Sequence, residues 1–500
     1  MVAEQKYSVI FALVKSNTMN AQTSNRMSSF RWVICGMLFL ATTINYMDRQ
    51  VLSLTWKDFI TLDFHWNDND YGNITATFSL FYAFISLFAG KVIDWMGTKK
   101  GYVLAIVIWS LGACLHAACG WATMRLTGIA DVETLRAVAE GSKLALTVST
   151  LSVWLFLACR IILATGESGN FPAAIKVTAE FFPKKDRAYA TSIFNAGASV
   201  GALAAPLTIP VQAEHMGWEM AFIIIGAIGF VWAGAWLLLY AAPAHNRFVN
   251  AEELAYIESD RQEDAAADRQ PAAEERKFSL LDCFRYRQTW AFIMGKLLTD
   301  GVWWFFLFWA PAYFSELGYP SSSGMGQLLI FVLYLIVTLV SIFGGYLPKL
   351  FVEKMGMHPY AGRMRAMLMF AVLPVFAMFA QPLAGVSPWW PCVIIGLAGA
   401  GHQAWSANLY STIGDMFPKS AIATITGIGT MFGGLCSFAI NKCSGMLFTY
   451  ADRMGEAFSF FGTTGKPAGY MIVFCYCAVA YLLAWVIMKL LVPRYKPVQG

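Results

Sequence analysis

The stretch "GKVIDWMGTKK", residues 90–100, places a short charged turn between two apolar runs. Gly90 and Gly97 permit a tight turn between two helices, because glycine adopts backbone conformations that other residues avoid. Asp94 can lie at a neighbouring helix N-terminus or pair with a base, and the lysines favour the cytoplasmic side of a membrane. We therefore expect Gly90, Asp94, Gly97 and Lys99 to form a conformational loop between two membrane helices.

The composition of the chain indicates a membrane protein. Of its 500 residues, 57% are hydrophobic and 13% are charged, which is about half the charge content usual in soluble domains. A soluble globule this apolar would expose large greasy patches. Runs of about twenty apolar residues, each sufficient for a membrane-spanning helix, recur throughout the sequence. Twelve spans are predicted: 31–55, 71–93, 101–121, 148–174, 188–211, 219–242, 289–316, 324–350, 364–382, 388–413, 421–447 and 467–490.

These spans divide into two halves with a repeated feature. The motif "EFFPK" at 180–184 follows the fourth span, and "DMFPK" at 415–419 follows the tenth. Such duplication is typical of transporters whose binding site lies between two bundles near the middle of the membrane. The predicted fold is an all-α polytopic membrane protein with twelve transmembrane helices in two six-helix bundles. The predicted parts are a leader (1–30), the N-terminal bundle (31–242), a linker (243–288), the C-terminal bundle (289–490) and a tail (491–500).

Basic residues orient these spans. Most of the 36 lysines and arginines fall in the termini, the linker and the loops on the same side. By the positive-inside rule, both termini are expected in the cytoplasm, and the linker, where Asn250 and Glu253 could cap a short helix, lies there too. The expected location is the cytoplasmic (inner) membrane, which the chain crosses many times. The opposite loops hold only Lys57, Arg125, Arg136, Lys143, Arg453 and Lys466.

Several functional classes are not supported by the sequence. The ten cysteines show no metal-ligand spacing and mostly lie in apolar runs. We find no nucleophile beside a base and no phosphate-binding loop, so an enzyme or an ATP-driven pump is not expected. We expect no cofactor, no metal and no nucleic-acid partner. The expected partners are the bilayer, a small solute and a coupling ion, and the chain is expected to be a monomer.

Charged residues stand inside the predicted spans, where lipid penalises them. Asp48 and Arg49 lie in the first span and directly follow the uncharged run 32–47. Arg160 and Glu167, seven residues apart in the fourth span, project from one helix face, since seven residues make nearly two turns. In the seventh span, a lysine and an aspartate four residues apart can pair directly: Lys296 and Asp300. One interpretation is that these charges form structural ion pairs between helices.

The other interpretation is a proton-coupled anion carrier. An arginine fork matches a ligand carboxylate, and a buried acid that gains and loses an arginine partner can take up and release a proton near neutral pH. Arg49 or Arg160 could then be shared between a substrate and a protein acid. Aromatic faces and amide or hydroxyl groups, which suit hydroxyl-rich solutes, are abundant in the stretches 296–311 and 401–418.

The chain resembles a known family at several motifs. The 90–100 loop and the six-plus-six layout resemble the major facilitator superfamily, although Trp95 stands where a basic residue is usual. "NYMDR" at 45–49 and "RIILATGESGNFPA" at 160–173 resemble its anion:cation symporter branch. "KLLTDGVWWFFLFWAP" at 296–311 and "GHQAWSANLYSTIGDMFP" at 401–418 resemble bacterial hexuronate transporters within that branch.

This resemblance implies import of a hexuronate, such as galacturonate or glucuronate, by proton symport and alternating access. Asp48 and Glu167 would take up protons, and Arg160 and Asp300 would complete the coupling group. Arg49 would hold the carboxylate of the substrate. The expected substrate-binding residues are Tyr46, Arg49, Tyr82, Lys296, Trp304, His402, Gln403, Trp405, Ser406 and Asn408.

Two departures from that branch leave alternatives open. Residues 122–147 form a longer external segment than is usual, either a small lid or a tolerated insertion, and "ITGIGTMFGGLCS" at 425–437 lacks an asparagine common in sugar-acid symporters. The substrate could therefore be another organic anion, such as galactonate or glucarate. A multidrug/proton antiporter is less favoured, because "NAGASVGALAAP" at 195–206 lacks a Gly-Pro step. A membrane sensor is disfavoured because no signalling domain is attached.

Overall fold

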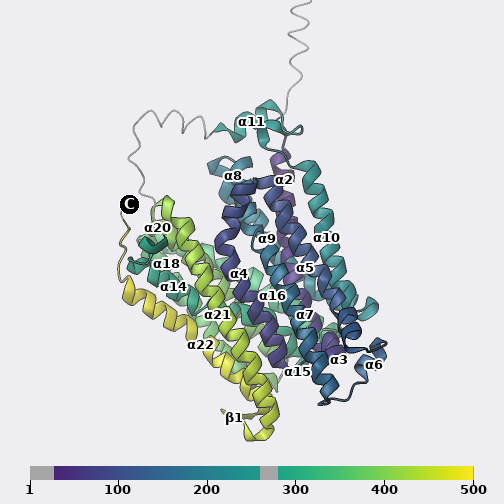
Figure 1. The fold of residues 1–500 in the computed structure, drawn as a ribbon. Helices are drawn as coiled ribbons and strands as arrows, with labels where there is room; N and C mark the ends of the chain where they lie inside the picture. The colour runs from purple at the N-terminus through teal and green to yellow at the C-terminus, as the bar shows by residue number, and fades with distance from the viewer. Residues whose placement is uncertain (1–26, 260–279, 499–500) are drawn as a thin grey trace, which may run out of the picture.

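The computed structural model describes residues 27–259 and 280–498, which are almost entirely helical. Figure 1 shows long helices running side by side, with α11 near one end and with α6 and β1 near the other. The N-terminal half comprises α2 (Phe30–Thr55), η1 (Trp56–Ile60), α3 (Thr61–Phe64), α4 (Asp68–Met96), α5 (Thr98–Thr127), α6 (Val132–Arg136), α7 (Lys143–Glu167), α8 (Asn170–Phe181), α9 (Lys184–Met216), α10 (Trp218–Leu239) and η2 (Pro243–His245).

The remaining elements follow the same helical pattern. The linker and the C-terminal half comprise α11 (Ala251–Ile257), α13 (Leu280–Cys283), α14 (Arg287–Leu297), α15 (Asp300–Glu316), α16 (Gly324–Ser341), α17 (Phe343–Met355), α18 (Pro359–Val372), η3 (Leu373–Phe379), α19 (Ala380–Ala384), α20 (Trp389–Met416), α21 (Lys419–Met454), η4 (Gly455–Ala457), the two-residue strands β1 (Ser459–Phe460) and β2 (Thr463–Thr464), and α22 (Gly465–Leu491).

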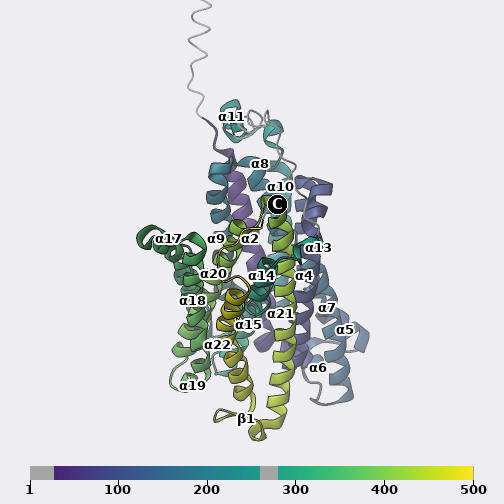
Figure 2. The same ribbon diagram turned by 90° about the vertical axis from the view of Figure 1, so that its left-hand side faces the viewer.

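These elements assemble into two bundles, as the sequence predicts. In one, α2 packs on α9, α5 on α7 and α10, and α4 on α7; in the other, α16 and α18 pack on α20, and α14 and α21 on α22. Figure 2 shows α17, α18 and α22 on one side of the molecule and α5, α6 and α7 on the other. Ten helical segments in the described part are long and apolar enough to cross a membrane. The helices α20 and α21, of 28 and 36 residues, complete the twelve.

Two predicted spans contain a break beside a charged residue. The fourth span is interrupted between α7, which ends at Glu167, and α8. The seventh is interrupted between α14 and α15, so that Lys296 and Asp300 lie on either side of the break. Tyrosines of α22 bond to the carbonyls at this second break: Tyr476 donates to Leu298 O (2.9 Å) and Tyr481 to Thr299 O (3.2 Å). Non-helical backbone is thereby satisfied within the bundle, as apolar surroundings require.

The two halves meet along α4 and α21, where small side chains allow close contact. A Cβ atom on Gly72 would lie 2.9 Å from the Cα of Gly445, and one on Gly434 would lie 2.2 Å from the Cβ of Ala83. Between these points Ser437 Oγ donates to Ser79 Oγ at 2.9 Å. Helices in lipid associate through such small residues, because tight packing replaces the hydrophobic effect that is absent there.

Polar contacts between the halves are concentrated at the end that bears α6 and β1. Glu316 of α15 binds Lys57 and Lys466 (both 2.5 Å), and Lys466 also binds Asp68 of α4 (2.7 Å). Nearby, Asp58 of η1 accepts the backbone N–H of Ser321 at 2.6 Å. Within the described residues, the hydrogen bonds and ion pairs between the halves lie at this end or near the middle. This end of the interface is therefore closed by a network of charges.

The segment 122–147, which the sequence predicts to be external, docks onto its own half. Arg136 at the end of α6 binds Asp63 of α3 at 2.6 Å, and Trp218 Nε1 donates to the other oxygen of the same carboxylate at 2.7 Å. The ring of His65 contacts the carbonyl of Leu135 at 3.3 Å. Residues 122–147 thus extend α5, form the short α6 and begin α7 at Lys143, five residues before the predicted start of the fourth span.

The linker helix α11 caps α2. Asn250 caps α11, as predicted, by accepting the N–H of Glu253 at 2.9 Å. Glu253 itself instead accepts the N–H groups of Phe30 (3.1 Å) and Arg31 (3.0 Å) in the first turn of α2, and it binds the Arg31 guanidinium at 3.0 Å. Because α2 has no side-chain cap of its own, this buried carboxylate satisfies its free N–H groups.

We expect Glu253→Ala to lower the free energy of unfolding by about 3 kcal/mol, because it leaves Arg31 and the first turn of α2 without their partner. The measurement is denaturant or thermal unfolding of the purified protein in detergent. Glu252→Ala is the matched control, since it removes the neighbouring exposed carboxylate and should leave stability nearly unchanged. Equal effects of the two substitutions would show that the cap does not stabilise α2.

Candidate functional site

A cavity of about 190 Å³ lies between the two halves. This volume is below the roughly 300–1,000 Å³ of sites for drug-sized ligands, so the cavity suits a small solute. Both bundles contribute to its wall, through α2, α4 and α8 of the N-terminal half and α14, α15, α20 and α21 of the C-terminal half. The lining residues are Tyr46, Arg49, Ser79, Tyr82, Phe171, Lys296, Asp300, Trp303, Trp304, His402, Gln403, Ser406, Tyr410, Thr430 and Gly434.

Arg49 is the cationic residue on the N-terminal wall. Its Nε donates to Glu167 Oε2 at 2.6 Å, which joins α2 to the end of α7. Its guanidinium lies 4.7 Å from the ring centroid of Tyr82 and 5.3 Å from those of Tyr46 and Trp304. Aromatic faces hold a guanidinium plane in one orientation, and they leave its edge free to bind a planar anion.

Behind Arg49 lies a fully buried group of charges. Asp48 and Glu167 are 1% and 0% exposed, and Arg160 is 2% exposed. Neither carboxylate oxygen of Asp48 has a hydrogen-bond partner among the described residues, although Arg49, Arg160 and Glu167 lie within electrostatic range. The Arg160 guanidinium lies over the ring of Phe78 at 5.6 Å. These three residues do not line the cavity, so they can act on a solute only through Arg49 or through a rearrangement.

The C-terminal wall carries a second ion pair. Lys296 Nζ lies 2.6 Å from Asp300 Oδ2 across the break between α14 and α15, so the predicted pairing is present. The lysine also lies over the ring of Tyr410 at 4.8 Å. The helix α21 approaches the same carboxylate oxygen closely at Gly433, where a Cβ atom would lie 2.1 Å from Asp300 Oδ2. Glycine at this position therefore leaves the space that the aspartate occupies.

Polar groups of α20 complete this wall. His402, Ser406 and Tyr410 recur every fourth residue and so share one helix face, with Gln403 beside them. His402 Nδ1 lies 2.7 Å from Tyr481 Oη, and its ring stacks on Trp303 at a centroid distance of 5.7 Å. A sugar-sized solute would meet hydroxyl, amide and imidazole groups here.

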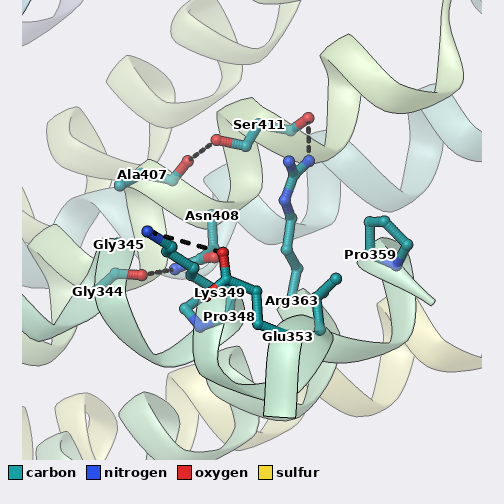
Figure 3. A pocket seen from close by; sticks show the side chains of 11 residues that line it. Gly344, Gly345, Pro348, Lys349, Glu353, Pro359, Arg363, Ala407, Asn408 and Ser411 are labelled. Carbon is teal, nitrogen blue, oxygen red and sulfur yellow. Dashed lines mark hydrogen bonds and ion pairs between the residues drawn. The ribbon is translucent and has the colours of Figure 1, made fainter. Parts of the chain in front are cut away.

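Two of the predicted substrate-binding residues lie outside this cavity. Trp405 is fully buried, and its Nε1 contacts the carbonyl of Gly295 at 3.4 Å. Asn408 donates to the carbonyls of Gly344 and Ala404, both at 2.8 Å, and it lines a separate pocket of about 360 Å³ among α17, α18 and α20. Figure 3 shows this pocket, in which Arg363 reaches the carbonyl of Ser411 at 2.7 Å. In this conformation, both residues join α20 to its neighbours.

Several lining residues are absent from the set that the sequence predicts. They are Ser79, Phe171, Tyr410, Thr430 and Gly434. Helical spacing was the available signal: Tyr410 lies four residues after Ser406, and Ser79 lies three before Tyr82. Phe171 follows the break between α7 and α8, which the hydropathy of the sequence does not mark.

The predicted conformational loop lies far from the cavity. Gly97 separates α4 from α5 with a positive φ of 79°, which glycine adopts without strain. Asp94 binds Lys176 of α8 at 2.6 Å and so pairs with a base, one of the two expected arrangements. Gly90 lies within α4, and Lys99 lies in the first turn of α5. The loop thereby connects α4, α5 and α8 at the α11 end.

The repeated motifs hold equivalent ends of the two bundles. Glu180 in the first copy accepts the hydroxyl of Thr98 at 2.6 Å and also bonds to Tyr240, so it joins α5 to the end of α10. Asp415 in the second copy pairs with Arg363 of α18.

No cluster of three or more histidine, cysteine, aspartate or glutamate residues arranged to hold a metal occurs in residues 27–259 and 280–498.

Two helical bundles that enclose a polar cavity, with charged groups in its wall, form an architecture typical of membrane transporters. The sequence profile of the Major Facilitator Superfamily matches residues 38–440. The chain therefore belongs to this superfamily: it is a multi-pass membrane transporter and not an enzyme.

Known proteins resemble the chain over most of its length. The hexuronate transporter of Escherichia coli (strain K12) is 27% identical over 435 residues, which cover 86% of this chain and 90% of the relative. The galacturonate transporter of Dickeya chrysanthemi is 25% identical over 367 residues, covering 72% and 95%. The crystal structure of a D-xylose-proton symporter has a TM-score of 0.65 at 14% identity, covering 94% of this chain and 98% of that one, and so shares the fold.

We expect Gly433→Ala to destabilise the protein by about 1–3 kcal/mol, because the new methyl group would displace the Asp300 carboxylate from Lys296. Thermal unfolding in detergent measures the effect. Gly414→Ala on α20 is the control: a Cβ atom there meets nothing within 4 Å, and alanine favours a helix more than glycine does. A Gly433→Ala protein as stable as the control would show that this ion pair can shift without cost.

Proposed function

We propose that this protein imports a hexuronate, such as galacturonate or glucuronate, together with protons. The observation that carries the proposal is the Arg49 guanidinium, which faces a sugar-sized cavity between three aromatic rings while Glu167 holds its Nε from behind. The names of the relatives support the same class of solute.

The two walls of the cavity suit the two ends of a sugar acid. Arg49 offers paired N–H donors to a carboxylate, a geometry that a lysine cannot reproduce. Opposite it, Gln403, Ser406 and His402 offer partners for ring hydroxyls, and Trp303 and Trp304 offer apolar faces for the ring. A lipophilic cation would meet Arg49 and Lys296, so a multidrug antiporter fits the cavity less well.

Proton coupling would arise from competition for the arginines. While Asp48 and Glu167 are charged, they hold Arg49 and Arg160 by electrostatic attraction. Protonation would weaken that attraction and free Arg49 for the incoming carboxylate. Release of the substrate toward the cytoplasm, followed by loss of the protons, would restore the starting arrangement. In this scheme, protonation of Asp300 would likewise weaken its ion pair with Lys296 and free the lysine for the substrate.

The described conformation would be closed to the outside. The ion pairs of Glu316 and Lys466 gather at the end that bears α6 and β1, which the positive-inside rule predicts to be external. Both termini and α11 would then be cytoplasmic, at the end where described polar contacts between the halves are lacking. Alternating access would require these external pairs to separate while the cytoplasmic ends approach each other.

The experiment that tests the proposal is uptake of labelled galacturonate into proteoliposomes, with and without an inward proton gradient. Unlabelled glucuronate, galactonate and glucarate serve as competitors. Uptake that depends on the gradient and is blocked by hexuronates alone would support both substrate and coupling. Stronger competition by galactonate or glucarate would reassign the substrate, and uptake driven by sodium alone would reassign the coupling ion.

We expect Asp48→Asn to abolish gradient-driven accumulation while leaving measurable substrate binding, because the amide cannot cycle a proton. Accumulation and binding are measured on the same purified protein. Glu140→Gln, which neutralises an exposed acid in the external segment, should transport as wild type does. Uphill uptake by the Asp48→Asn protein at the wild-type rate would remove this acid from the coupling group.

We expect Arg49→Lys to raise the KM for galacturonate by about tenfold or more, since lysine keeps the charge but loses the fork and the stacking on Tyr82. Initial uptake rates over a range of galacturonate concentrations give the KM. Arg125→Lys is matched in chemistry, because Arg125 also stacks on a tryptophan, Trp121, but lies outside the cavity. An unchanged KM in Arg49→Lys would mean that another group binds the carboxylate.

A further inference from the structure

His402 lies in a setting that determines where its proton sits. The residue lines the cavity from α20 and is 5% exposed. Its Nδ1 lies 2.7 Å from Tyr481 Oη, and its ring is nearly parallel to that of Trp303, at 5°. Its second ring nitrogen, Nε2, has no hydrogen-bond partner among the residues that the structure describes.

The neighbours of Tyr481 decide the direction of that hydrogen bond. Tyr481 Oη also lies 3.2 Å from the carbonyl oxygen of Thr299, which can only accept. A tyrosine hydroxyl has one proton, so donating it to Thr299 leaves the oxygen as acceptor toward His402. The imidazole must then carry its proton on Nδ1. If Tyr481 instead donated its proton to His402, lone pairs of Tyr481 Oη and of the Thr299 carbonyl oxygen would face each other at 3.2 Å.

The remaining nitrogen of His402 is therefore an acceptor. No carboxylate pairs with His402 in the described part of the chain, and the charged group that acts on it is Lys296. A doubly protonated His402 would place a second positive charge in this buried site, which would be costly. A neutral imidazole protonated at Nδ1 has only a lone pair at Nε2. Arg49 and Lys296, by contrast, can only donate.

The break between α14 and α15 makes this arrangement possible. The carbonyl of Thr299 lies at the break, where its two lone pairs accept the N–H of Val302 at 3.1 Å and the hydroxyl of Tyr481 at 3.2 Å. The adjacent carbonyl of Leu298 accepts from Tyr476 at 2.9 Å. Both tyrosines belong to α22 and bond to the same break, but only Tyr481 also contacts His402. Tyr476 therefore provides a natural control for effects on the break itself.

We propose that His402 is a specificity-determining residue whose Nε2 accepts a hydrogen bond from one hydroxyl of the substrate, and that Tyr481 is the positioning residue that fixes this proton arrangement. The inference rests on the proposed function, because it takes a sugar acid as the occupant of the cavity. It adds to that function a requirement for a donating hydroxyl at one position of the ring.

The test compares galacturonate with its deoxy and deoxyfluoro analogues, one ring position at a time, as competitors of labelled galacturonate uptake. Fluorine keeps the size and polarity of a hydroxyl but cannot donate. We expect one position at which both analogues bind wild type about tenfold or more weakly, which corresponds to the loss of one buried hydrogen bond. In the His402→Ala protein, unlabelled galacturonate should compete for uptake no better than those two analogues do.

The tyrosine variants separate positioning from structural support. Tyr481→Phe should reduce the discrimination at the same position several-fold, whereas Tyr476→Phe should keep it at the wild-type level. Equal loss of discrimination in both variants would mean that the break, and not the proton on His402, sets the specificity. Equal competition by all analogues in wild type would overturn the inference and leave hexuronate transport standing.

A second measurement does not depend on the substrate. Nitrogen NMR of the ¹⁵N-histidine-labelled protein, with the His402 signals identified by their loss in His402→Ala, reports which ring nitrogen carries the proton. We expect a protonated Nδ1 and a bare Nε2, and a change of this pattern in Tyr481→Phe. A proton on Nε2 would overturn the inference. If the wild-type protein takes up no sugar acid at all, the proposed function is overturned. The hydrogen bond between His402 and a substrate hydroxyl then falls with it.

Discussion

The arrangement of the cavity depends on the cost of leaving a charge unpaired in an apolar bundle. Arg49 is nearly buried, and its bond to Glu167 at 2.6 Å compensates the charge from behind the cavity wall. That bond joins the first span to the fourth at the point where α7 ends. Because one side of the guanidinium is occupied by protein, only the other side remains for a solute. The ion pair thus gives the N-terminal wall both its stability and its polarity.

The C-terminal wall obeys the same constraint through a different device. The break between α14 and α15 places Lys296 next to Asp300 and lets the carbonyls of Leu298 and Thr299 accept hydrogen bonds from outside their own helix. Hydroxyls of α22 bond to both carbonyls, Thr299 O also accepting the N–H of Val302, and one of those hydroxyls also contacts His402. The hydrogen-bonding requirement of the broken backbone is therefore connected to the chemistry of the cavity. A transporter can place a polar site at mid-depth only if such requirements are met inside the protein.

Close packing of small residues lets α4 and α21 approach each other directly beside the cavity. Gly72, Ala83 and Gly434 bring α4 against α21, while the charged contacts lie at the α6 end around Glu316 and Lys466. The half-buried pair of Lys57 with Glu316 contributes little stability by itself, so it can separate at modest cost. The pair of Lys466 with Asp68 is buried, so the two charges can separate only if water or other partners replace the contact.

The number of spans, the two-bundle architecture and the charged residues inside the spans could all be predicted from the sequence, because hydropathy, charge and repeated motifs can be read along the chain without knowledge of its packing. The sequence also selected most of the residues that line the cavity, such as Arg49, Tyr82 and Ser406. Three features appear only in the folded chain: Trp405 and Asn408 contact neighbouring helices, Gly433 makes room for Asp300, and Glu253 caps α2. These features depend on which helix faces approach each other and on where spans break, and both follow from packing between segments that lie far apart in the sequence.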